Sequence, residues 1–444
     1  MHHPASPAPP PPPPDDWLGR ALHAYGRVPL VAKILVALVL GIAAGYALGK
    51  GAAALEPMYK IILRLLGALA TPLIFLAVVN ALVKTEVRGA MAGRMLWLLM
   101  LNTVVAILVG ITVANLMRPG VGAGLAAPAD EEAPTDRRPY NLVDDLLGKL
   151  PSSVVKPFAE NDILGVIFLA LAAGIALRVV RGQLLAEGSA SHRAVEDLLD
   201  VSLRVVMVVL HWVIAVVPLA VFAVVAGLVG AKGIAGFQSM LWFVLAVLIA
   251  LGIQACYYLV RLAIWSRFHP WVFLRGAGDA LMLAFSTASS AATMPVSYAC
   301  ARDKLGVREE AAGLGVFVGG TFNHDGTALY EAMAALFISQ VIGRQLGFSE
   351  QVLVVIMSVV ASVGAAGIPE AGLVTMLAVF KSVGLPIEYI PLLLTVDWFL
   401  DRCRTAINVM GDLAVTCMLD GPEAGGSAPG SVEQPARTNG DPPG

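Results

Sequence analysis

The sequence is poor in charged residues and in cysteine. Only 14% of its 444 residues are Asp, Glu, Lys or Arg, whereas an ordinary soluble domain has about 25%. With 57% hydrophobic residues, this shortage of charge excludes a soluble globular protein. The formal net charge of -2 gives no indication of a nucleic-acid partner. The four cysteines are widely spaced and include no Cys-x-x-Cys pair, so we expect neither a disulfide framework nor a zinc site.

The two ends of the chain lack the residues that build a folded core. Residues 4–14 are mostly proline, and residues 1–16 have neither the basic start nor the apolar centre of a signal peptide. Residues 421–444 are rich in Gly, Pro, Ser and Glu and contain few large apolar residues. Such segments cannot bury enough apolar surface to offset the entropy of ordering, so we expect both ends to be disordered.

Long apolar runs fill much of the remaining sequence. A helix needs about 20 apolar residues to cross a bilayer, so each run predicts a membrane-spanning helix. Lys and Arg are more frequent on one set of alternating loops, which by the positive-inside rule predicts that both termini are cytoplasmic. We therefore expect a multi-pass protein of the plasma (cell inner) membrane. The runs lie near 29–49, 58–83, 92–117, 161–180, 201–230 and 235–264.

Two further apolar segments do not have the pattern of simple spans. Residues 281–301 and 352–380 each carry small and polar residues with a proline at the centre, STASSAATMP in the first and SVGAAGIP in the second. The two segments differ in the charge of the residues that flank them. Basic residues flank the first segment on both sides. Irregular backbone at membrane depth is tolerated only where it is buried in protein or lines a cavity. We therefore predict two re-entrant hairpins that enter from opposite faces.

Each hairpin is followed by a helix with polar residues at mid-membrane. The sequence NHDGT at 323–327 interrupts an apolar run from 311 to 342, and Asn408 and Asp412 lie in the last helix. A hairpin followed by such a helix, repeated with opposite entry, is typical of a secondary transporter whose site lies between the repeats. The spacing differs between the two copies, so the symmetry alone is weak support.

The last helix carries a polar stripe. Asp397, Asp401, Arg404, Asn408 and Asp412 follow one another at steps of four, three, four and four, and so share about 80° of the helix circumference. Placing an ionisable group in the membrane interior costs roughly several kcal/mol of free energy. The stripe therefore predicts bound ions, a bound substrate or salt bridges that only join helices.

Other polar residues remain open to two interpretations. Arg402 lies on a different face of the last helix, where it either takes part in function or reaches for water or carbonyl groups. Asp325, beside Gly326, is either a hard-oxygen ligand for Na⁺ at a helix break or a helix cap. The pair Ser289–Ser290 offers hydroxyl and N–H groups to an anion at a helix start.

At these residues the chain resembles the dicarboxylate/amino acid:cation symporter family, which includes the glutamate/aspartate and excitatory amino acid transporters. The resemblance implies an all-α polytopic fold of eight transmembrane helices plus two re-entrant helical hairpins in inverted repeats, a homotrimer in the lipid bilayer and an elevator mechanism. It also implies scaffold and trimerisation helices in 17–275, of which the third and sixth move with a transport core in 276–420. The motifs are ASSAATMP at 288–295, GGTFNHDGTALYEA at 319–332, SVGAAGIPEAG at 362–372 and VDWFLDRCRTAINVMGD at 396–412.

The resemblance also implies roles for single residues. Arg404 would bind the side-chain carboxylate of an acidic amino acid and Asp401 its amino group. The other substrate-binding positions would be Asn408, Thr405, Thr327, Ser289, Ser290, Ile368 and Gly372. Na⁺, the co-transported ion, would be bound in three places, by Asp412 with Gly319, Asn323 and Asn408, by Thr321 with the Ser362 region and His324, and by Asp325 with Asn323, Asn102 and Thr103. Glu331 and Arg402 would couple transport to protons or K⁺. No cofactor is expected.

Four positions depart from the family pattern: His324 replaces a methionine, Leu99 a tyrosine, Ala291 a serine, and Glu370 a glutamine or glycine. These departures affect the number and affinity of ions rather than the fold. If the His324 imidazole faces an ion site, a proton and Na⁺ would compete there.

Alternative functions remain open at this stage. A C4-dicarboxylate or neutral amino-acid symporter would use the same fold, although Asp401 disfavours a substrate without an amine and Arg404 one without a second carboxylate. An intramembrane aspartyl protease would need two carboxylates close enough to share a proton, with no arginine between them. A channel is the third alternative. We expect a carrier and not an enzyme.

Overall fold

The structure, a computed structural model, describes residues 28, 30–84, 89–122, 151–161, 163–233, 235–364 and 371–421. Within these ranges the secondary structure is helical and contains no strand. The expected disordered ends, 1–16 and 421–444, lie outside the described residues except for Gly421. Residues 123–150, between the third and fourth apolar runs, also lie outside them.

Each of the six apolar runs coincides with a helix. The continuous stretch from α2 to α3 and each of the other four helices are long and apolar enough to cross a membrane. The prediction of a multi-pass membrane protein is therefore confirmed by length and composition. The helices are α2 (Leu30–Leu48), α3 (Glu56–Lys84), α4 (Gly89–Met117), α7 (Ile163–Ala186), α8 (His192–Lys232) and α9 (Ala235–Trp265).

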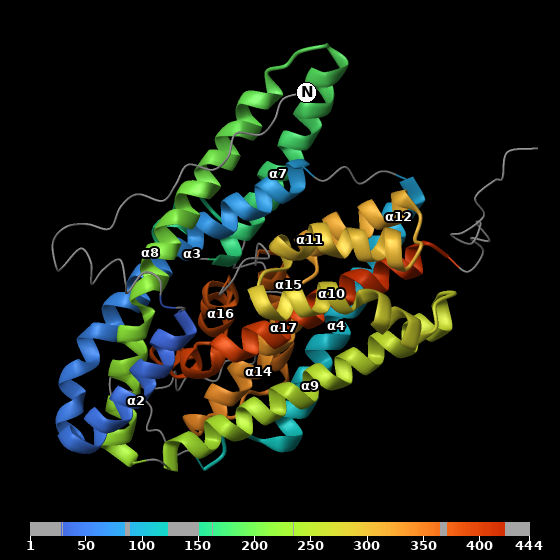
Figure 1. Ribbon diagram of the computed structural model, residues 1–444. Helices are drawn as coiled ribbons and strands as arrows, with labels where there is room; N and C mark the ends of the chain where they lie inside the picture. The colour runs from blue at the N-terminus through green and yellow to red at the C-terminus, as the bar shows by residue number, and fades with distance from the viewer. Residues whose placement is uncertain are drawn as a thin grey trace, which may run out of the picture.

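Helix α8 is longer than its apolar run. It begins at His192 rather than near residue 201 and has 41 residues, so it is about 60 Å long at 1.5 Å per residue. The extra turns carry charged side chains, and Arg181 at the end of α7 pairs with Glu196 at an N–O distance of 2.7 Å. Figure 1 shows α7 and α8 projecting together from the rest of the molecule. The hydropathy pattern missed these turns because they are polar.

The first predicted hairpin is a pair of antiparallel helices, α10 (Pro270–Thr287) and α11 (Ser290–Ala299). The chain reverses at Ala288, whose φ is 52°, and at Ser289, whose Oγ accepts a hydrogen bond from the Ala292 N–H at 3.1 Å. The hairpin begins eleven residues earlier than predicted, because the first turns of α10 include Arg275 and Asp279 and are not apolar. A π-helical turn, η2 (Cys300–Lys304), follows α11.

The predicted helix interruption is confirmed. The helical segments α12 (Glu309–Gly313), η3 (Leu314–Val318) and α13 (Gly319–Phe322) end at Asn323, whose backbone is extended. His324, which is also not helical, follows, and α14 (Asp325–Val341) then begins. Nearly every residue of α14 is buried. Gly326 lets α14 approach the last helix closely, since a Cβ there would lie 2.7 Å from the Arg404 carbonyl oxygen.

The second hairpin consists of α15 (Phe348–Gly364) and α16 (Ala371–Ser382), which pack against each other. Its tip, residues 365–370, lies outside the described residues. The tip includes Ile368, an expected substrate contact, and Glu370, which departs from the family pattern. A short turn, η4 (Ile387–Tyr389), leads into the last helix, α17 (Ile390–Leu419).

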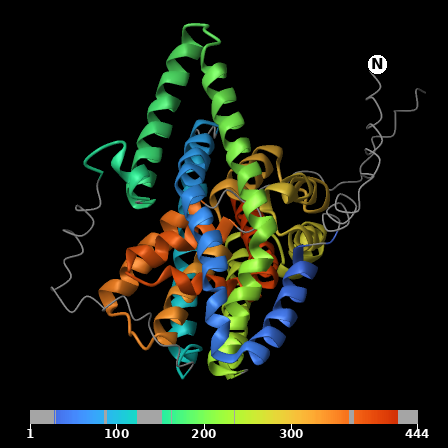
Figure 2. The ribbon, with the colours of Figure 1, turned by 90° about the vertical axis from the view of Figure 1, so that its left-hand side faces the viewer.

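The helices form two groups (Figures 1 and 2). Helices α2, α3, α7 and α8 pack along one another on one side. Helices α10, α14, α15, α16 and α17 form the other group, with α4 and α9 packed against α14 and α17. This arrangement brings the third and sixth apolar helices to the polar segments. The division into scaffold and transport core, and the full count of eight helices with two hairpins, stay predictions.

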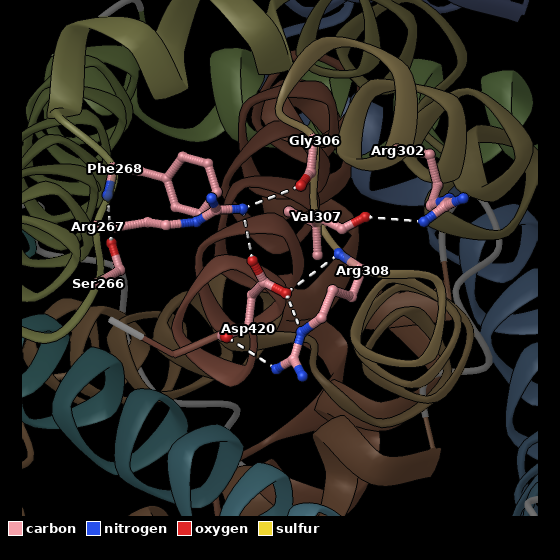
Figure 3. A network of polar contacts seen from close by, with 8 residues as sticks. All are labelled: Ser266, Arg267, Phe268, Arg302, Gly306, Val307, Arg308 and Asp420. Atoms are coloured by element: carbon pink, nitrogen blue, oxygen red, sulfur yellow. Dashed lines mark hydrogen bonds and ion pairs between the residues drawn. The ribbon is translucent and has the colours of Figure 1, made fainter. Parts of the chain in front are cut away.

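A cluster of charged residues fastens the end of α17 (Figure 3). The buried Asp420 carboxylate accepts hydrogen bonds from Arg267 Nη2 at 2.8 Å and from Arg308 Nε at 2.9 Å. The Arg308 N–H also donates to Asp420, at 3.1 Å. Burial alone would raise the pKa of the Asp420 carboxyl, but the hydrogen bonds from Arg308 and the charge of Arg267 lower this pKa below its ordinary value. The cluster therefore joins the ends of α9 and α17 to the start of α12.

Candidate functional site

The predicted polar stripe of α17 lies in the interior. All five of its side chains are buried, and Arg404 is 0% exposed. Arg404 Nη1 donates to Asp397 Oδ1 and Arg404 Nη2 to Asp401 Oδ1, both at 2.8 Å. The guanidinium also lies over the Tyr330 ring, 3.9 Å from its centroid. Two carboxylates and an aromatic face thus hold one buried cation, a favourable arrangement for a guanidinium.

Residues of α14 and α16 surround the Arg404 head group. Glu331 is fully buried and accepts a hydrogen bond from Thr375 through Oε1, while its Oε2 has no hydrogen-bond partner among the described residues. A Cβ on Gly372 would lie 3.5 Å from Arg404 Nη2 and 3.2 Å from the Thr327 methyl carbon. The second arm of hairpin 2 therefore packs closely against Arg404 and Thr327 at Gly372.

Asn408 joins α17 to the start of α14. Its Oδ1 accepts a hydrogen bond from the Gly326 N–H at 2.7 Å, and its Nδ2 lies 3.4 Å from Thr327 Oγ1. Thr405 instead donates its hydroxyl hydrogen to the Asp401 carbonyl of its own helix, at 2.8 Å. Asn408 and Thr327 are therefore brought together as the resemblance implies, whereas the Thr405 hydroxyl is engaged within α17.

Asp412 faces the helix break. Its Oδ1 accepts a hydrogen bond from Asn323 Nδ2 at 3.0 Å, and a Cβ on Gly319 would lie 3.1 Å from the same oxygen. Carboxylate and carbonyl oxygens are the ligands that a hard cation prefers. Thr321, by contrast, donates its hydroxyl hydrogen to the Phe317 carbonyl, at 2.8 Å.

Asp325 is fully buried at the first position of α14. Its two oxygens accept hydrogen bonds from Thr103 Oγ1 of α4 at 2.7 Å and from Tyr258 Oη of α9 at 2.5 Å. Asn102, beside Thr103, is also buried. The expected cation ligands Asp325, Asn102 and Thr103 therefore lie together, but each already contacts other protein groups.

His324 is buried at the break, and its Nδ1 lies 3.0 Å from the Ser362 carbonyl oxygen of α15. A carbonyl only accepts hydrogen bonds, so this contact requires the hydrogen on Nδ1. Nε2 has no hydrogen-bond partner in the part of the chain that the structure describes. The His324 side chain thus joins the break to the arm of hairpin 2 that carries Ser362.

Hairpin 1 places Ser289 and Ser290 at its buried tip, where Ser289 caps α11. Arg402 approaches the same hairpin from α17. Its Nη1 donates to the carbonyl oxygens of Phe285 and Ser286, the former at 3.0 Å. This contact agrees with the interpretation in which Arg402 reaches for carbonyl groups. It also joins the last helix to the end of α10.

Residues 30–421 match the sodium:dicarboxylate symporter family. The chain belongs to this family. The C4-dicarboxylate transport protein of Rhodospirillum rubrum is 31% identical over 412 residues, which cover 90% of this chain and 89% of that protein. Excitatory amino acid transporter 1 of Ambystoma tigrinum is 31% identical over 80% of this chain and 74% of its own length. Human excitatory amino acid transporter 1 is 38% identical over 262 residues, 58% of this chain.

This symporter site also contains residues that the sequence analysis did not select. Tyr330 and Thr375 contact Arg404 and Glu331, and Tyr258 contacts Asp325. One signal was present in the sequence: Gln254, Tyr258 and Arg261 follow at steps of four and three in the run at 235–264, and so share one helix face. The surrounding apolar residues made that run look like an ordinary span.

Proposed function

We propose that this symporter is a secondary active transporter for acidic amino acids, glutamate or aspartate, coupled to Na⁺, to protons or to both. In this proposal it works as a homotrimer in the plasma (cell inner) membrane with both termini cytoplasmic, and an elevator movement carries the site across the bilayer. Members of the family are transporters rather than enzymes, and both Asp397 and Asp401 bind Arg404 rather than each other, which disfavours a protease dyad.

The arrangement of opposite charges in one buried cluster carries the proposal. Asp397, Asp401 and Arg404 bear a formal net charge of -1 by simple count. An acidic amino acid brings two carboxylates and one ammonium group. Its side-chain carboxylate would bind Arg404 and its ammonium Asp401, so these two buried charges would each gain an oppositely charged partner from the substrate. Asn408, Thr327, Ser290 and the segment that includes Ile368 and Gly372 would surround the rest.

A C4-dicarboxylate is the second candidate, favoured by the Rhodospirillum rubrum relative. Its two carboxylates would compete for Arg404, but neither could satisfy Asp401. Leaving a buried charge without a partner costs about 3–5 kcal/mol. The Asp401 position therefore supports the amino acid over the dicarboxylate.

The cations would bind where carboxylate and carbonyl oxygens meet. The geometry around Asp412, with Asn323 and Gly319 beside it, supports one Na⁺ position, and the Ser362 carbonyl beside His324 supports a second near Thr321. Glu331, fully buried beside Arg404, is the best candidate for a proton-carrying group, and Arg402 would act through hairpin 1.

Uptake of radiolabelled aspartate into proteoliposomes tests the proposal. With imposed Na⁺, H⁺ and K⁺ gradients, we expect uptake to require at least one cation gradient and to be inhibited by glutamate but not by succinate or alanine. Asp401→Asn should abolish aspartate uptake, whereas Asp279→Asn, in α10, where the carboxylate pairs with Lys304, is the matched control and should leave it unchanged. Succinate uptake that survives Asp401→Asn would instead identify a C4-dicarboxylate carrier.

A further inference from the structure

Three buried side chains of α9 converge on the segment of α4 that carries Asn102 and Thr103. Gln254 Nε2 donates to the Asn102 carbonyl oxygen at 3.3 Å, Tyr258 donates to Asp325, and Arg261 Nη1 donates to Asn102 Oδ1. Gln254 and Tyr258 are 0% exposed and Arg261 is 5% exposed. A complete guanidinium group therefore lies inside the protein at a position where the resemblance implies a bound Na⁺.

The environment of Arg261 differs from that of a surface arginine. Its guanidinium carbon lies 4.8 Å from the Trp265 ring centroid and 5.3 Å from that of Tyr257, and Nη1 also donates to the Tyr257 hydroxyl at 3.1 Å. Nε and Nη2 are buried and have no hydrogen-bond partner among the described residues. A buried cation of this kind needs a compensating anion. Asp325 is the carboxylate of this network, because Thr103 and Tyr258 donate to it while Arg261 donates to Asn102, beside Thr103.

The oxygen atoms that would coordinate an ion here are engaged with protein donors. Asn102 Oδ1 accepts from Arg261, the Asn102 carbonyl accepts from Gln254, and both Asp325 oxygens accept from hydroxyl groups. Leu99, which stands where the family has a tyrosine, adds no side-chain oxygen, and its carbonyl accepts a hydrogen bond from Thr103. A hard cation binds through several oxygen ligands at once, and a guanidinium beside them would repel it.

We propose that Arg261 is a built-in cation that takes the place of a Na⁺ at the position formed by Asp325, Asn102 and Thr103. This inference rests on the proposed cation coupling. The positive charge that stabilises Asp325 is then part of the protein, remains with it in both directions of transport, and never dissociates. The transporter therefore couples one Na⁺ fewer than it would with an ion at this position.

Two substitutions at one position separate charge from packing. Arg261→Met removes the charge and keeps an unbranched side chain, whereas Arg261→Lys keeps a tethered cation. Arg267→Met is the control, because Arg267 lies just beyond α9 and binds Asp420 outside this cluster. The first measurement is the melting temperature of purified protein without substrate, as NaCl replaces choline chloride.

We expect the Na⁺-dependent rise in melting temperature to be larger in Arg261→Met, which gains one Na⁺ position, than in wild type, Arg261→Lys and Arg267→Met. In proteoliposomes, the Hill coefficient for Na⁺ in aspartate uptake should rise by about one in Arg261→Met. Equal Na⁺ dependence of melting in wild type and Arg261→Met would overturn the proposal. Because this measurement needs no substrate, its result is independent of whether the proposed substrate is correct.

A double variant covers the case in which Arg261→Met does not fold. Arg261→Met/Asp325→Asn removes both charges, so folded protein should be recovered, with a Na⁺-dependent rise in melting temperature no larger than that of wild type. If the double variant is as poorly folded as Arg261→Met alone, Arg261 acts through packing and the proposal is wrong.

Discussion

Replacing Arg404 by cysteine tests the centre of the proposed substrate site. The guanidinium makes two charge-assisted hydrogen bonds of 2.8 Å in a fully buried position. Removing one partner of a buried, hydrogen-bonded charge pair costs about 2–5 kcal/mol of binding free energy. At about 1.4 kcal/mol for each factor of ten, the dissociation constant for aspartate should rise between about 30-fold and a few thousandfold. Small neutral amino acids should bind instead, because they bring no carboxylate that needs Arg404.

The assay is equilibrium binding of aspartate and serine to purified protein, followed by uptake in proteoliposomes. Arg308→Cys is the control, because it also removes an arginine that pairs with a carboxylate, but that carboxylate is Asp420 at the end of α17. Arg404→Cys leaves Asp397 and Asp401 without their guanidinium, so its melting temperature must be measured as well. Arg404→Cys/Asp397→Asn removes one of these carboxylates and should recover stability but not aspartate binding. Undiminished aspartate and glutamate uptake in a folded Arg404→Cys protein would refute the assignment.

Three further variants test neighbouring groups. Glu331→Gln should make uptake insensitive to a pH gradient or restrict the carrier to exchange, and unchanged proton-driven net uptake would assign proton coupling to another group. His324→Met removes the contact with the Ser362 carbonyl, so the Na⁺ concentration for half-maximal aspartate binding should change. Substrate selectivity should stay the same. Identical Na⁺ titrations of wild type and His324→Met would show that this contact is irrelevant to ion binding. Asp420→Asn should reduce stability by about 1–3 kcal/mol at neutral pH, towards the lower value because the two arginines are partly exposed. Since the folded pKa of Asp420 is lowered, this difference should be present above about pH 4 and disappear as the pH falls through the folded pKa; a difference in melting temperature that is the same at every pH would contradict this role.

The membrane-spanning helices could be predicted because a bilayer requires about 20 apolar residues in each of them. Each apolar run became a helix, and the break at Asn323 and His324 followed from polar residues in an otherwise apolar segment. The ends of helices could not be predicted in this way. Helix α8 continues past its apolar run because its added turns are supported by the pair Arg181–Glu196, and hydropathy does not report such pairs.

The candidate site was predicted along single helices but not between them. A 3.6-residue period places the five polar residues of α17 on one face, and the structure buries all of them. The same period places Gln254, Tyr258 and Arg261 on one face of α9, but the role of these residues depends on which helix that face contacts. That partner, the segment of α4 around Asn102, is about 150 residues away in sequence, and its contact with α9 is a property of the packed structure.

The two buried arginines of the core are held by different kinds of partner, and this difference separates their roles. Arg404 is bound to two carboxylates and, in the proposed function, would exchange Asp401 for a substrate carboxylate while the substrate ammonium pairs with Asp401. Arg261 is bound to amide and phenol oxygens and lies over aromatic rings. An incoming anion would have to displace neutral groups there and separate Arg261 from the field of Asp325. The first arrangement suits a ligand that binds and leaves in every cycle, and the second suits a charge that stays.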